Sequence, residues 1–282
     1  MSIRIDDLTV TFKNGVTAVD HVDLEIPHGI FGLLGENGAG KTTLMRVLTT
    51  VLAPTSGKVL LDGTLYCEAN YEKIQKKIGY LPQEIDLYPS LTVRECLEYM
   101  GDLAGIEKRE SKKRIDYYLE KTSLADHQKK KMRQLSGGMK RKLMVCRALL
   151  TDPEILLLDE PTAGMDALSR RQMWNLLRKL NEKKLTILLT THYMEEAQSL
   201  CNRVALMDHG KLEEVSTPSA LIESLGAYAV DEMTADGTQN HYFHTRQEAI
   251  RYLEQLTGQA SLRETTLEDV FVERAGKHLI SK

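Results

Sequence analysis

Gly35-Glu36-Asn37-Gly38-Ala39-Gly40-Lys41-Thr42-Thr43 is the stretch that decides the fold of this chain. It matches the pattern G-x-x-x-x-G-K-[ST] and follows an apolar, strand-like run, Ile30–Leu34. Four apolar residues come next at helical spacing: Leu44, Val47, Leu48 and Val51. A glycine-rich loop between a strand and a helix turns tightly around an anion, with its N–H groups and the positive end of the helix dipole pointing inward. Lys41 adds a point charge for the β- and γ-phosphates, and the Thr42 hydroxyl suits Mg²⁺. The stretch therefore predicts a nucleoside-triphosphate site.

The composition is that of an ordinary soluble globular protein. The 282 residues, 42% hydrophobic and 27% charged, can hold one large domain or a core with a small appendage. A formal net charge of −3 gives no global bias toward nucleic acid or anionic lipid. Four scattered cysteines without a C-x-x-C pair suggest neither a zinc site nor disulfides, and fit a reducing cytosol. The N-terminus lacks a secretion-signal pattern and no apolar run is long enough to span a bilayer, so we expect any membrane role to come through a partner.

A second chemical feature is an apolar run that ends in two carboxylates, Ile155–Leu158 followed by Asp159 and Glu160. Such a run suits a central parallel strand that is buried on both faces, and ligands of parallel sheets lie at the carboxyl ends of the strands. Neighbouring residues of a strand point to opposite sides, so the two carboxylates can have different tasks. Asp159 can join the Mg²⁺ shell, while Glu160 can reach a water that attacks the γ-phosphate.

Four further residues are ambiguous on their own. Ser136 and two glycines open a helix, which makes either an anion-binding helix end or an ordinary serine N-cap. Gln83 and His192 each follow an apolar strand, where a ligand contact and plain solvation both fit. Phe12 lies in a connection near Gly15, where its ring can stack on an adenine or serve as an ordinary core or edge phenylalanine.

The order of the predicted elements indicates an α/β fold. Antiparallel strands open the chain, and residues 88–150 are mostly helical. Their dense charges, at 107–114 and 129–133, favour solvated helix faces over a nucleic-acid patch. A short strand is predicted at 58–61 and buried strands at 78–81, 155–158 and 186–191, and a hairpin over 203–207 and 212–215 closes the main domain.

The remainder after Pro218 is predicted to form a small separate α/β unit. Its first feature is a hairpin whose strands, 228–233 and 238–244, flank the turn signal Asp236-Gly237. An amphipathic helix follows over 247–256, with three apolar residues on one face: Ile250, Leu253 and Leu256. A further strand and a final helix are expected over 260–263 and 267–274. Nothing catalytic stands out in this unit.

Taken together, these pieces resemble the ATP-binding subunit of an ATP-binding cassette (ABC) transporter, over at least Ile3–Val215. The motifs occur in the family's order: Gly35–Thr43 (Walker A), Gln83 (Q-loop), Leu135–Met139 (signature), Ile155–Glu160 (Walker B), Ala163–Asp166 (D-loop) and His192 (switch histidine). The resemblance implies a P-loop NTPase (RecA-like) core over 1–217 with an antiparallel β subdomain and a helical subdomain over about 88–150. It also implies a small C-terminal α/β domain over 218–282.

The resemblance also implies ATP and Mg²⁺ as cofactors and a mechanism that needs two copies. Two cassettes pack head to tail, so that Ser136, Gly137 and Gly138 hold the γ-phosphate of the ATP bound by the opposite protomer. Glu160 is then the general base, and His192 holds the γ-phosphate and the water in line. The residues implied for nucleotide binding are Phe12, Gly35, Glu36, Asn37, Gly38, Ala39, Gly40, Lys41, Thr42, Thr43 and Gln83. Those implied for the metal are Thr42, Gln83 and Asp159, and the D-loop contributes Asp166.

Small departures from the family pattern point to a branch. Met139 replaces the usual glutamine of the signature, Phe12 replaces the more common tyrosine, and the D-loop reads Ala-Gly-Met-Asp. None of these removes a catalytic group. The methionine, the run Thr191–Ala197 and the ending Leu267–Phe271 resemble exporter subunits that serve drugs, antibiotics and polysaccharides. In that branch the cassette and the membrane subunit are usually separate chains.

The leading hypothesis is therefore an export motor. It would work as a homodimer, or as a pseudo-dimer with a homologous cassette, on the inner face of the cell membrane. An integral-membrane permease would hold it there, docked near Gln83 and the helical region. The alternative is a soluble cassette ATPase acting on ribosomes or DNA, which usually has two cassettes in one chain or a long coiled-coil insertion. A P-loop kinase or metabolic ATPase is disfavoured by Leu135–Met139. Co-purification with a polytopic membrane protein would favour the export motor, whereas co-sedimentation with ribosomes would favour the soluble ATPase. No nucleic-acid partner is expected.

Overall fold

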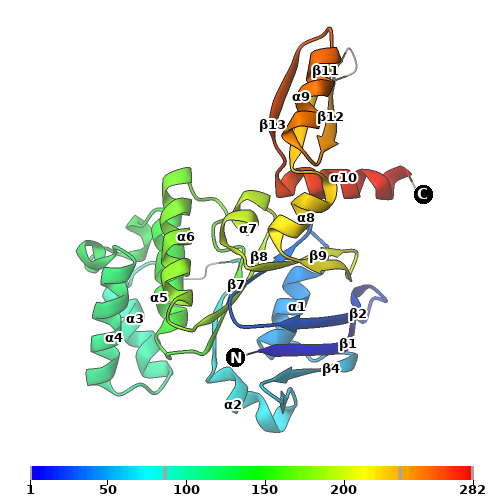
Figure 1. Ribbon diagram of the computed structural model, residues 1–282. Coiled ribbons are helices and arrows are strands. Elements are labelled where there is room, and N and C mark those ends of the chain that lie inside the picture. The colour runs from blue at the N-terminus through cyan, green and yellow to red at the C-terminus, as the bar shows by residue number, and fades with distance from the viewer. Residues whose placement is uncertain (1, 85–87, 235–236, 281–282) are drawn as a thin grey trace. The chain divides into compact units, whose positions relative to one another are not determined.

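The computed structural model describes residues 2–84, 88–234 and 237–280, with side chains up to residue 274. The chain divides into two compact units, of which the first comprises residues 1–192 and 205–214, and the second 193–204 and 215–282 (Figure 1). The sequence places this boundary at residue 217. In the structure the second unit begins at Val215 and also takes in Tyr193–Val204.

The larger sheet of the first unit holds six strands in the order β10-β9-β3-β8-β7-β6. Their bounds are β3 Ile30–Leu34, β6 Ile78–Leu81, β7 Ile155–Asp159, β8 Thr186–Thr191, β9 Arg203–Asp208 and β10 Lys211–Ser216. The four strands β3, β8, β7 and β6 pair in parallel, and every residue of β3, β7 and β8 is buried. The uninterrupted apolar runs of the sequence produce this burial on both faces. The carboxyl ends of these strands therefore share one edge, where ligands of parallel sheets bind.

A second, antiparallel sheet has the order β2-β1-β4-β5. Its strands are β1 Ile3–Thr11, β2 Thr17–Ile26, β4 Ser56–Leu61 and β5 Thr64–Leu65. Buried and exposed residues alternate along β1 and β2, as expected for strands with one face toward the core. Helix α1, Lys41–Leu48, contacts β2 of this sheet and β7 of the larger one. The helix of the phosphate loop is thus packed by both sheets.

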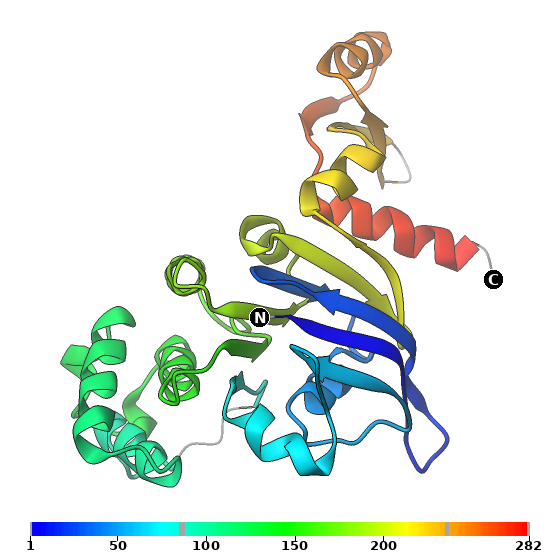
Figure 2. The ribbon, with the colours of Figure 1, turned by 60° about the horizontal axis from the view of Figure 1, so that its bottom comes forward.

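The remaining helices of the first unit are α2 Tyr71–Gln75, α3 Val93–Leu103, α4 Lys108–Lys121, α5 Gly137–Leu149 and α6 Ala167–Asn181. Short 3-10 turns lie at Glu68–Asn70, Ala125–His127 and Met132–Gln134. In Figures 1 and 2, α3, α4 and α5 lie together beside the β-sheets. They share a hydrophobic core that includes Leu97, Ile115 and Leu143, each 0% exposed. The structure confirms the predicted α/β fold class with its antiparallel and helical parts.

One sequence prediction about α1 is wrong. Val51 was expected to continue the apolar face of this helix, but the helix ends at Leu48 and the Val51 side chain is 74% exposed. The chain turns directly after the helix, and Thr50 has a φ of 61°. The N–H groups of Val51 and Leu52 bond back to the carbonyl of Arg46, which closes the helix end. Helical spacing does not reveal such a stop, because the pattern of apolar residues continues past it.

The second unit contains a three-stranded antiparallel sheet in the order β12-β11-β13. Its elements are α7 Met194–Leu200, α8 Pro218–Leu225, β11 Tyr228–Thr234, β12 Gly237–Phe243, α9 Arg246–Gln255, β13 Ala260–Glu264 and α10 Leu267–Ile280. The predicted hairpin, helix and strand are therefore present, while Asp236 of the predicted turn lies outside the described residues. On α9 the fully buried residue is Ala249, whereas Ile250 is 37% exposed.

An ion network ties the sheet of the second unit to α10. Arg263 on β13 donates to Asp231 on β11 at 2.8 Å and to both carboxylate oxygens of Asp269 on α10 at 2.7 and 2.8 Å. Burial alone would raise the pKa of Asp269, but the hydrogen bonds from Arg263 and Thr266 outweigh it and lower this pKa. The ionised carboxylate consequently stabilises the folded unit.

This pairing predicts a pH-dependent stability of the second unit. Because the folded pKa of Asp269 is depressed, its contribution is complete above the unfolded value of about 4 and is lost as the pH falls through the folded value. At pH 7, Asp269→Asn is expected to cost about 1.5–3 kcal/mol, the value of hydrogen bonds to charged groups. Hydrogen exchange of the β11 and β13 amides from pH 7 downward measures this. Glu254→Gln, on an exposed residue of α9, is the control, and equal protection in both variants would contradict the prediction.

Candidate functional site

The phosphate loop joins β3 to α1 and is held in shape by its neighbours in the first unit. Gly40 directly precedes the helix with a φ of 105°, and a Cβ at that position would lie 2.2 Å from the carbonyl oxygen of Ala18. Both features require glycine there. The carbonyl of Ala39 accepts a hydrogen bond from the N–H of Gly210 at 3.0 Å. Strand β2 and the β9–β10 turn thus fix the loop from outside, which leaves its inner N–H groups for an anion.

Lys41 is the buried cation of the site, with 5% of its surface exposed. Its Nζ donates to the carbonyl oxygens of Gly35 at 2.7 Å and Glu36 at 2.8 Å. Burial lowers the pKa of Lys41, and the negative charges of Glu160 and Asp159 oppose that shift. The ammonium group therefore sits in a poorly solvated position where a phosphate would interact with it strongly.

The two carboxylates emerge from β7 as predicted and are both buried. Asp159 is the last residue of the strand, and its Oδ1 accepts a hydrogen bond from the Thr190 hydroxyl at 2.5 Å. Its Oδ2 is buried and, within the described part of the chain, has no hydrogen-bond partner. Glu160 follows with a φ of 49°, so the backbone enters the left-handed region immediately after the strand. The two side chains have different partners, Thr190 for Asp159 and His192 for Glu160, which supports separate tasks for them.

His192 meets Glu160 at the edge of the sheet. Its Nδ1 lies 3.2 Å from Glu160 Oε1, and the histidine side chain is 38% exposed while the glutamate side chain is 9% exposed. The two residues follow the neighbouring strands β8 and β7, which pair in parallel. The structure thus brings together a buried carboxylate and a half-exposed imidazole that the sequence singled out separately.

The signature serine caps a different helix. Ser136 is the N-cap of α5, and its Oγ accepts a hydrogen bond from the Met139 N–H at 3.3 Å. Ser136 and Gly137 are exposed. Among the described residues, no hydrogen bond or ion pair joins Ser136, Gly137 or Gly138 to the phosphate loop of the same chain. The start of α5 therefore presents free N–H groups to a ligand from outside its own loop.

The other predicted site residues lie at the periphery. Phe12 sits in the turn between β1 and β2, where its N–H bonds to the carbonyl of Val16, and its ring is 37% exposed. Gln83 is exposed and follows the end of β6 by two residues. Asp166 is the N-cap of α6, where it accepts hydrogen bonds from the N–H and the hydroxyl of Ser169 at 2.9 and 2.7 Å. These bonds lower the pKa of Asp166.

Two residues of the site escaped the sequence analysis. Arg141 on α5 is 7% exposed, and its Nη1 donates to the carbonyl of Pro82 at 3.0 Å, which links the signature helix to the residue before Gln83. Burial lowers the pKa of Arg141, against the attraction of Glu160 and Asp159. Its spacing of four and seven residues from the buried Val145 and Ala148 could have identified it. The second residue that the sequence analysis missed is Thr190.

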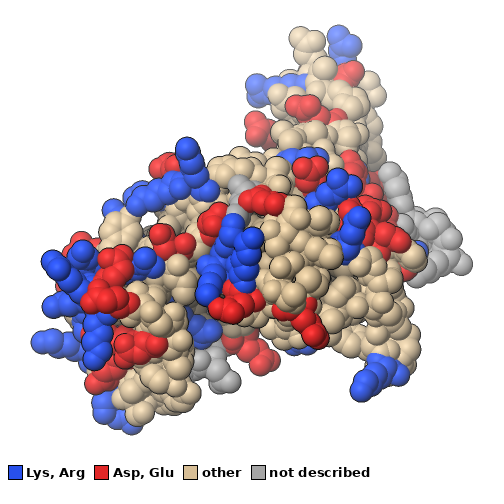
Figure 3. Space-filling model, turned by 90° about the horizontal axis from the view of Figure 1, so that it is seen from below, with Lys and Arg blue, Asp and Glu red and all other residues tan. Residues whose placement is uncertain are grey.

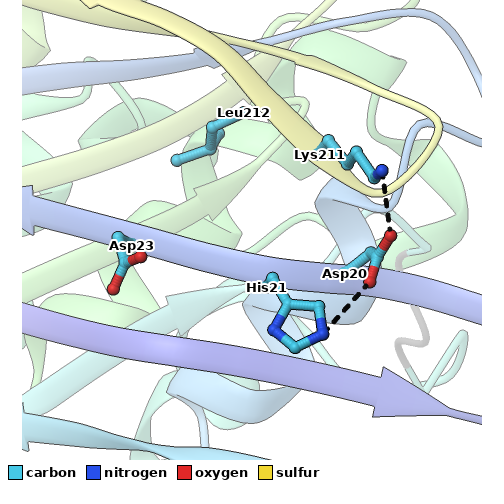
Figure 4. Close-up of a pocket in the computed structure, with 5 residues that line it drawn as sticks. All are labelled: Asp20, His21, Asp23, Lys211 and Leu212. Carbon is cyan, nitrogen blue, oxygen red and sulfur yellow. Dashed lines mark ion pairs between the residues drawn. The ribbon is translucent and has the colours of Figure 1, made fainter.

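A hollow of about 340 Å³ in the first unit is lined by Asp20, His21, Asp23, Lys211 and Leu212 (Figure 4). Its charges pair with one another: Lys211 lies 3.3 Å and His21 3.9 Å from Asp20. Carboxylates at such a surface repel phosphates. The hollow is therefore not the nucleotide site, which is formed by the strand edge and the phosphate loop described above.

Comparisons with known proteins agree with this geometry. A sequence model of the family described as ABC transporter matches residues 19–163, which include the phosphate loop and both carboxylates. The linearmycin resistance ATP-binding protein of Bacillus subtilis is 39% identical over 207 residues, covering 73% of this chain and 66% of that protein. Nod factor export ATP-binding protein I of Cupriavidus metallidurans is 36% identical over 284 residues, covering 93% of both chains.

A solved structure of a cassette is also similar to this chain in three dimensions. The ATP-binding cassette MJ0796, a dimer in a post-hydrolysis state with bound ADP and Pi, superposes with a TM-score of 0.69. The two sequences are 28% identical, and the likeness covers 76% of this chain and 98% of that one. The chain described here thus belongs to the ABC transporter family, as an ATP-binding subunit that hydrolyses ATP.

Proposed function

We propose that this chain works as one half of a head-to-tail cassette dimer that drives export through a separate membrane protein. The observation that supports a dimer concerns the start of α5. Among the described residues, no hydrogen bond or ion pair joins its exposed Ser136 and Gly137 to the phosphate loop of their own chain. A second copy can supply the missing half of each site, and the related cassette MJ0796 is a dimer with bound ADP and Pi.

Within each site the phosphate loop and Lys41 bind the triphosphate, and the exposed ring of Phe12 stacks on the adenine. Mg²⁺ fits the oxygen donors that remain: the Thr42 hydroxyl, the Gln83 amide and Asp159, whose buried Oδ2 lacks a hydrogen-bond partner in the described structure. The described residues contain no group of three or more His, Cys, Asp or Glu side chains that could hold a metal by themselves. A site with few protein ligands suits Mg²⁺, which is usually held by one or two carboxylates together with phosphates.

Glu160 is the general base in this proposal. Its buried carboxylate accepts a proton from the attacking water, and His192, 3.2 Å away, holds the water and the γ-phosphate in line. Ser136, Gly137 and Gly138 of the second copy complete the cradle around the γ-phosphate. Asp166 remains the D-loop residue of the proposal, although the structure shows it as the cap of α6.

Export requires a membrane-embedded partner. No helix in the described structure is long and apolar enough to cross a bilayer. The helical part of the first unit exposes an aromatic pair that suits such a partner: Tyr88, 55% exposed, and Tyr99, 42% exposed, with ring centroids 5.8 Å apart. Together with the exposed Gln83, these side chains favour a permease docked at this part of the cassette, on the cytoplasmic side of the membrane. The similarity to Nod factor export ATP-binding protein I supports the direction of transport.

A soluble ATPase that acts on ribosomes or DNA is the second candidate, and the charges do not favour it. On the face that Figure 3 shows, basic and acidic side chains lie side by side rather than as one basic surface. Arg94 with Asp116 and Arg114 with Glu110 are pairs of this kind. Nucleic-acid binding depends on unneutralised Lys and Arg.

Mixing two inactive variants tests the composite site. Glu160→Gln and Ser136→Ala are each expected to hydrolyse ATP slowly, because each damages both sites of its homodimer. In a mixed dimer one site combines an intact Glu160 from one copy with an intact Ser136 from the other. Mixing should therefore raise the ATPase rate severalfold above either variant, measured by phosphate release at several ratios. If a tag on one variant recovers the other variant in the presence of ATP, so that mixed dimers form, and the rate does not rise, the head-to-tail arrangement is refuted.

A further inference from the structure

We propose that Thr190 is a positioning residue that holds the Asp159 side chain and the Glu160 backbone in their working geometry. This inference rests on the roles proposed above for the two acidic residues. Neither the phosphate-loop motif nor the family's motif set includes Thr190, which stands inside an apolar strand two residues before His192.

The position of Thr190 in the sheet gives it access to both acidic residues. It lies on β8, between β3 and β7, and its register partners are Leu33 on β3 and Asp159 on β7. Its side chain is 0% exposed. The hydroxyl donates to Asp159 Oδ1 at 2.5 Å and accepts from the Glu160 N–H at 3.0 Å. A hydroxyl has one proton and two lone pairs, so both bonds form at the same time.

The first consequence concerns Glu160. Its φ of 49° lies in a region that non-glycine residues occupy only when the surroundings support it. The Glu160 N–H bonds to the main-chain oxygen of Thr190 at 3.2 Å as well as to its hydroxyl. The Thr190 hydroxyl thus helps to hold the Glu160 backbone in this turn, from which the Glu160 side chain approaches His192 to 3.2 Å.

The second consequence concerns Asp159. With Oδ1 engaged by Thr190, the carboxylate cannot rotate freely, and the oxygen that lacks a hydrogen-bond partner among the described residues is the buried Oδ2. Groups that hydrogen-bond a metal ligand from behind orient it and commonly change metal affinity 10- to 100-fold when removed. Thr190 therefore determines which carboxylate oxygen of Asp159 faces the proposed Mg²⁺.

Thr190→Val is the decisive variant because valine has nearly the same shape but no hydroxyl. We expect its kcat to fall by roughly 10- to 100-fold and the Mg²⁺ concentration needed for half-maximal activity to rise by a similar factor. A readout without turnover is the binding of Mn²⁺ to protein saturated with a non-hydrolysable ATP analogue, followed by the electron paramagnetic resonance signal of free Mn²⁺. This affinity should weaken in Thr190→Val, whereas analogue binding without metal should stay at the wild-type level.

Two controls separate positioning from folding. Thr190→Ser keeps the hydroxyl and should restore most of the kcat and of the Mn²⁺ affinity. Thr186→Val removes a hydroxyl that is also 0% exposed, at the opposite end of the same strand, and reports the general cost of such a change. Wild-type kcat and Mn²⁺ affinity in Thr190→Val, or equal losses in Thr190→Ser, would overturn the proposal. If Glu160→Gln keeps full turnover, the proposed role of Glu160 fails separately, whatever Thr190→Val shows.

Discussion

Glu160→Gln is expected to bind ATP with unchanged affinity and to lose most of its steady-state hydrolysis. The amide has almost the same shape as the carboxylate but cannot accept the proton of the attacking water. General-base catalysis typically contributes about 10²–10⁴-fold, so we expect a loss of kcat in this range. The backbone turn at φ 49° and the bond from its N–H to Thr190 are independent of the side chain, so the geometry around the site should remain.

Phosphate release under saturating Mg·ATP gives kcat, and calorimetric titration with ATP gives the affinity. Glu182→Gln, which changes an exposed glutamate after α6, controls for the loss of one negative charge. If Glu160→Gln turns over ATP at the wild-type rate, another group must accept the proton. His192, whose Nδ1 lies 3.2 Å from Glu160 Oε1, would be the first residue to examine.

The sequence alone was sufficient for the parts of the site that depend on backbone pattern. An apolar run, a glycine-rich loop and a helix leave few alternatives for Gly35–Thr43, and a run that is apolar on both faces must lie in the middle of a sheet. Glu160 after β7 and His192 after β8 then meet, because parallel neighbours end at the same edge. These predictions required only the knowledge of which strands are buried.

Contacts between side chains were beyond the sequence because they depend on register. Thr190 bonds to Asp159 only because the two residues are direct partners in the pairing of β7 with β8. Arg141 likewise reaches Pro82, 59 residues away, through the packing of α5 against β6. The end of α1 was missed for a related reason: backbone bonds to Arg46 stop the helix, and spacing does not report them. The pairing register of the strands and the backbone hydrogen bonds that end a helix can be read only from a structure.

Lys41→Met is expected to weaken ATP binding by about 10- to 100-fold, and hydrolysis at limiting ATP should fall with it. Hydrogen bonds to charged groups contribute about 1.5–3 kcal/mol, and about 1.4 kcal/mol corresponds to tenfold in affinity. Lys41 is 5% exposed, so its charge is screened little by water and its attraction to a triphosphate is correspondingly strong. Calorimetric titration measures the affinity. Lys112→Met, which removes an exposed lysine from α4, is the matched control.

The stability of the nucleotide-free protein must be measured separately, because Lys41 also makes hydrogen bonds within the protein. Its Nζ bonds to the carbonyl oxygens of Gly35 and Glu36, so its removal leaves both without this donor. Thermal unfolding with and without ATP separates the loss of the loop contact from the loss of the phosphate contact. Losing only the loop contact lowers the midpoint temperature of unfolding in the absence of nucleotide, whereas losing the phosphate contact reduces the increase in this midpoint that ATP produces. If Lys41→Met binds ATP as tightly as the wild type and keeps the full ATP-dependent rise, the N–H groups of the loop and of α1 hold the phosphates by themselves. The buried lysine would then serve the loop rather than the nucleotide.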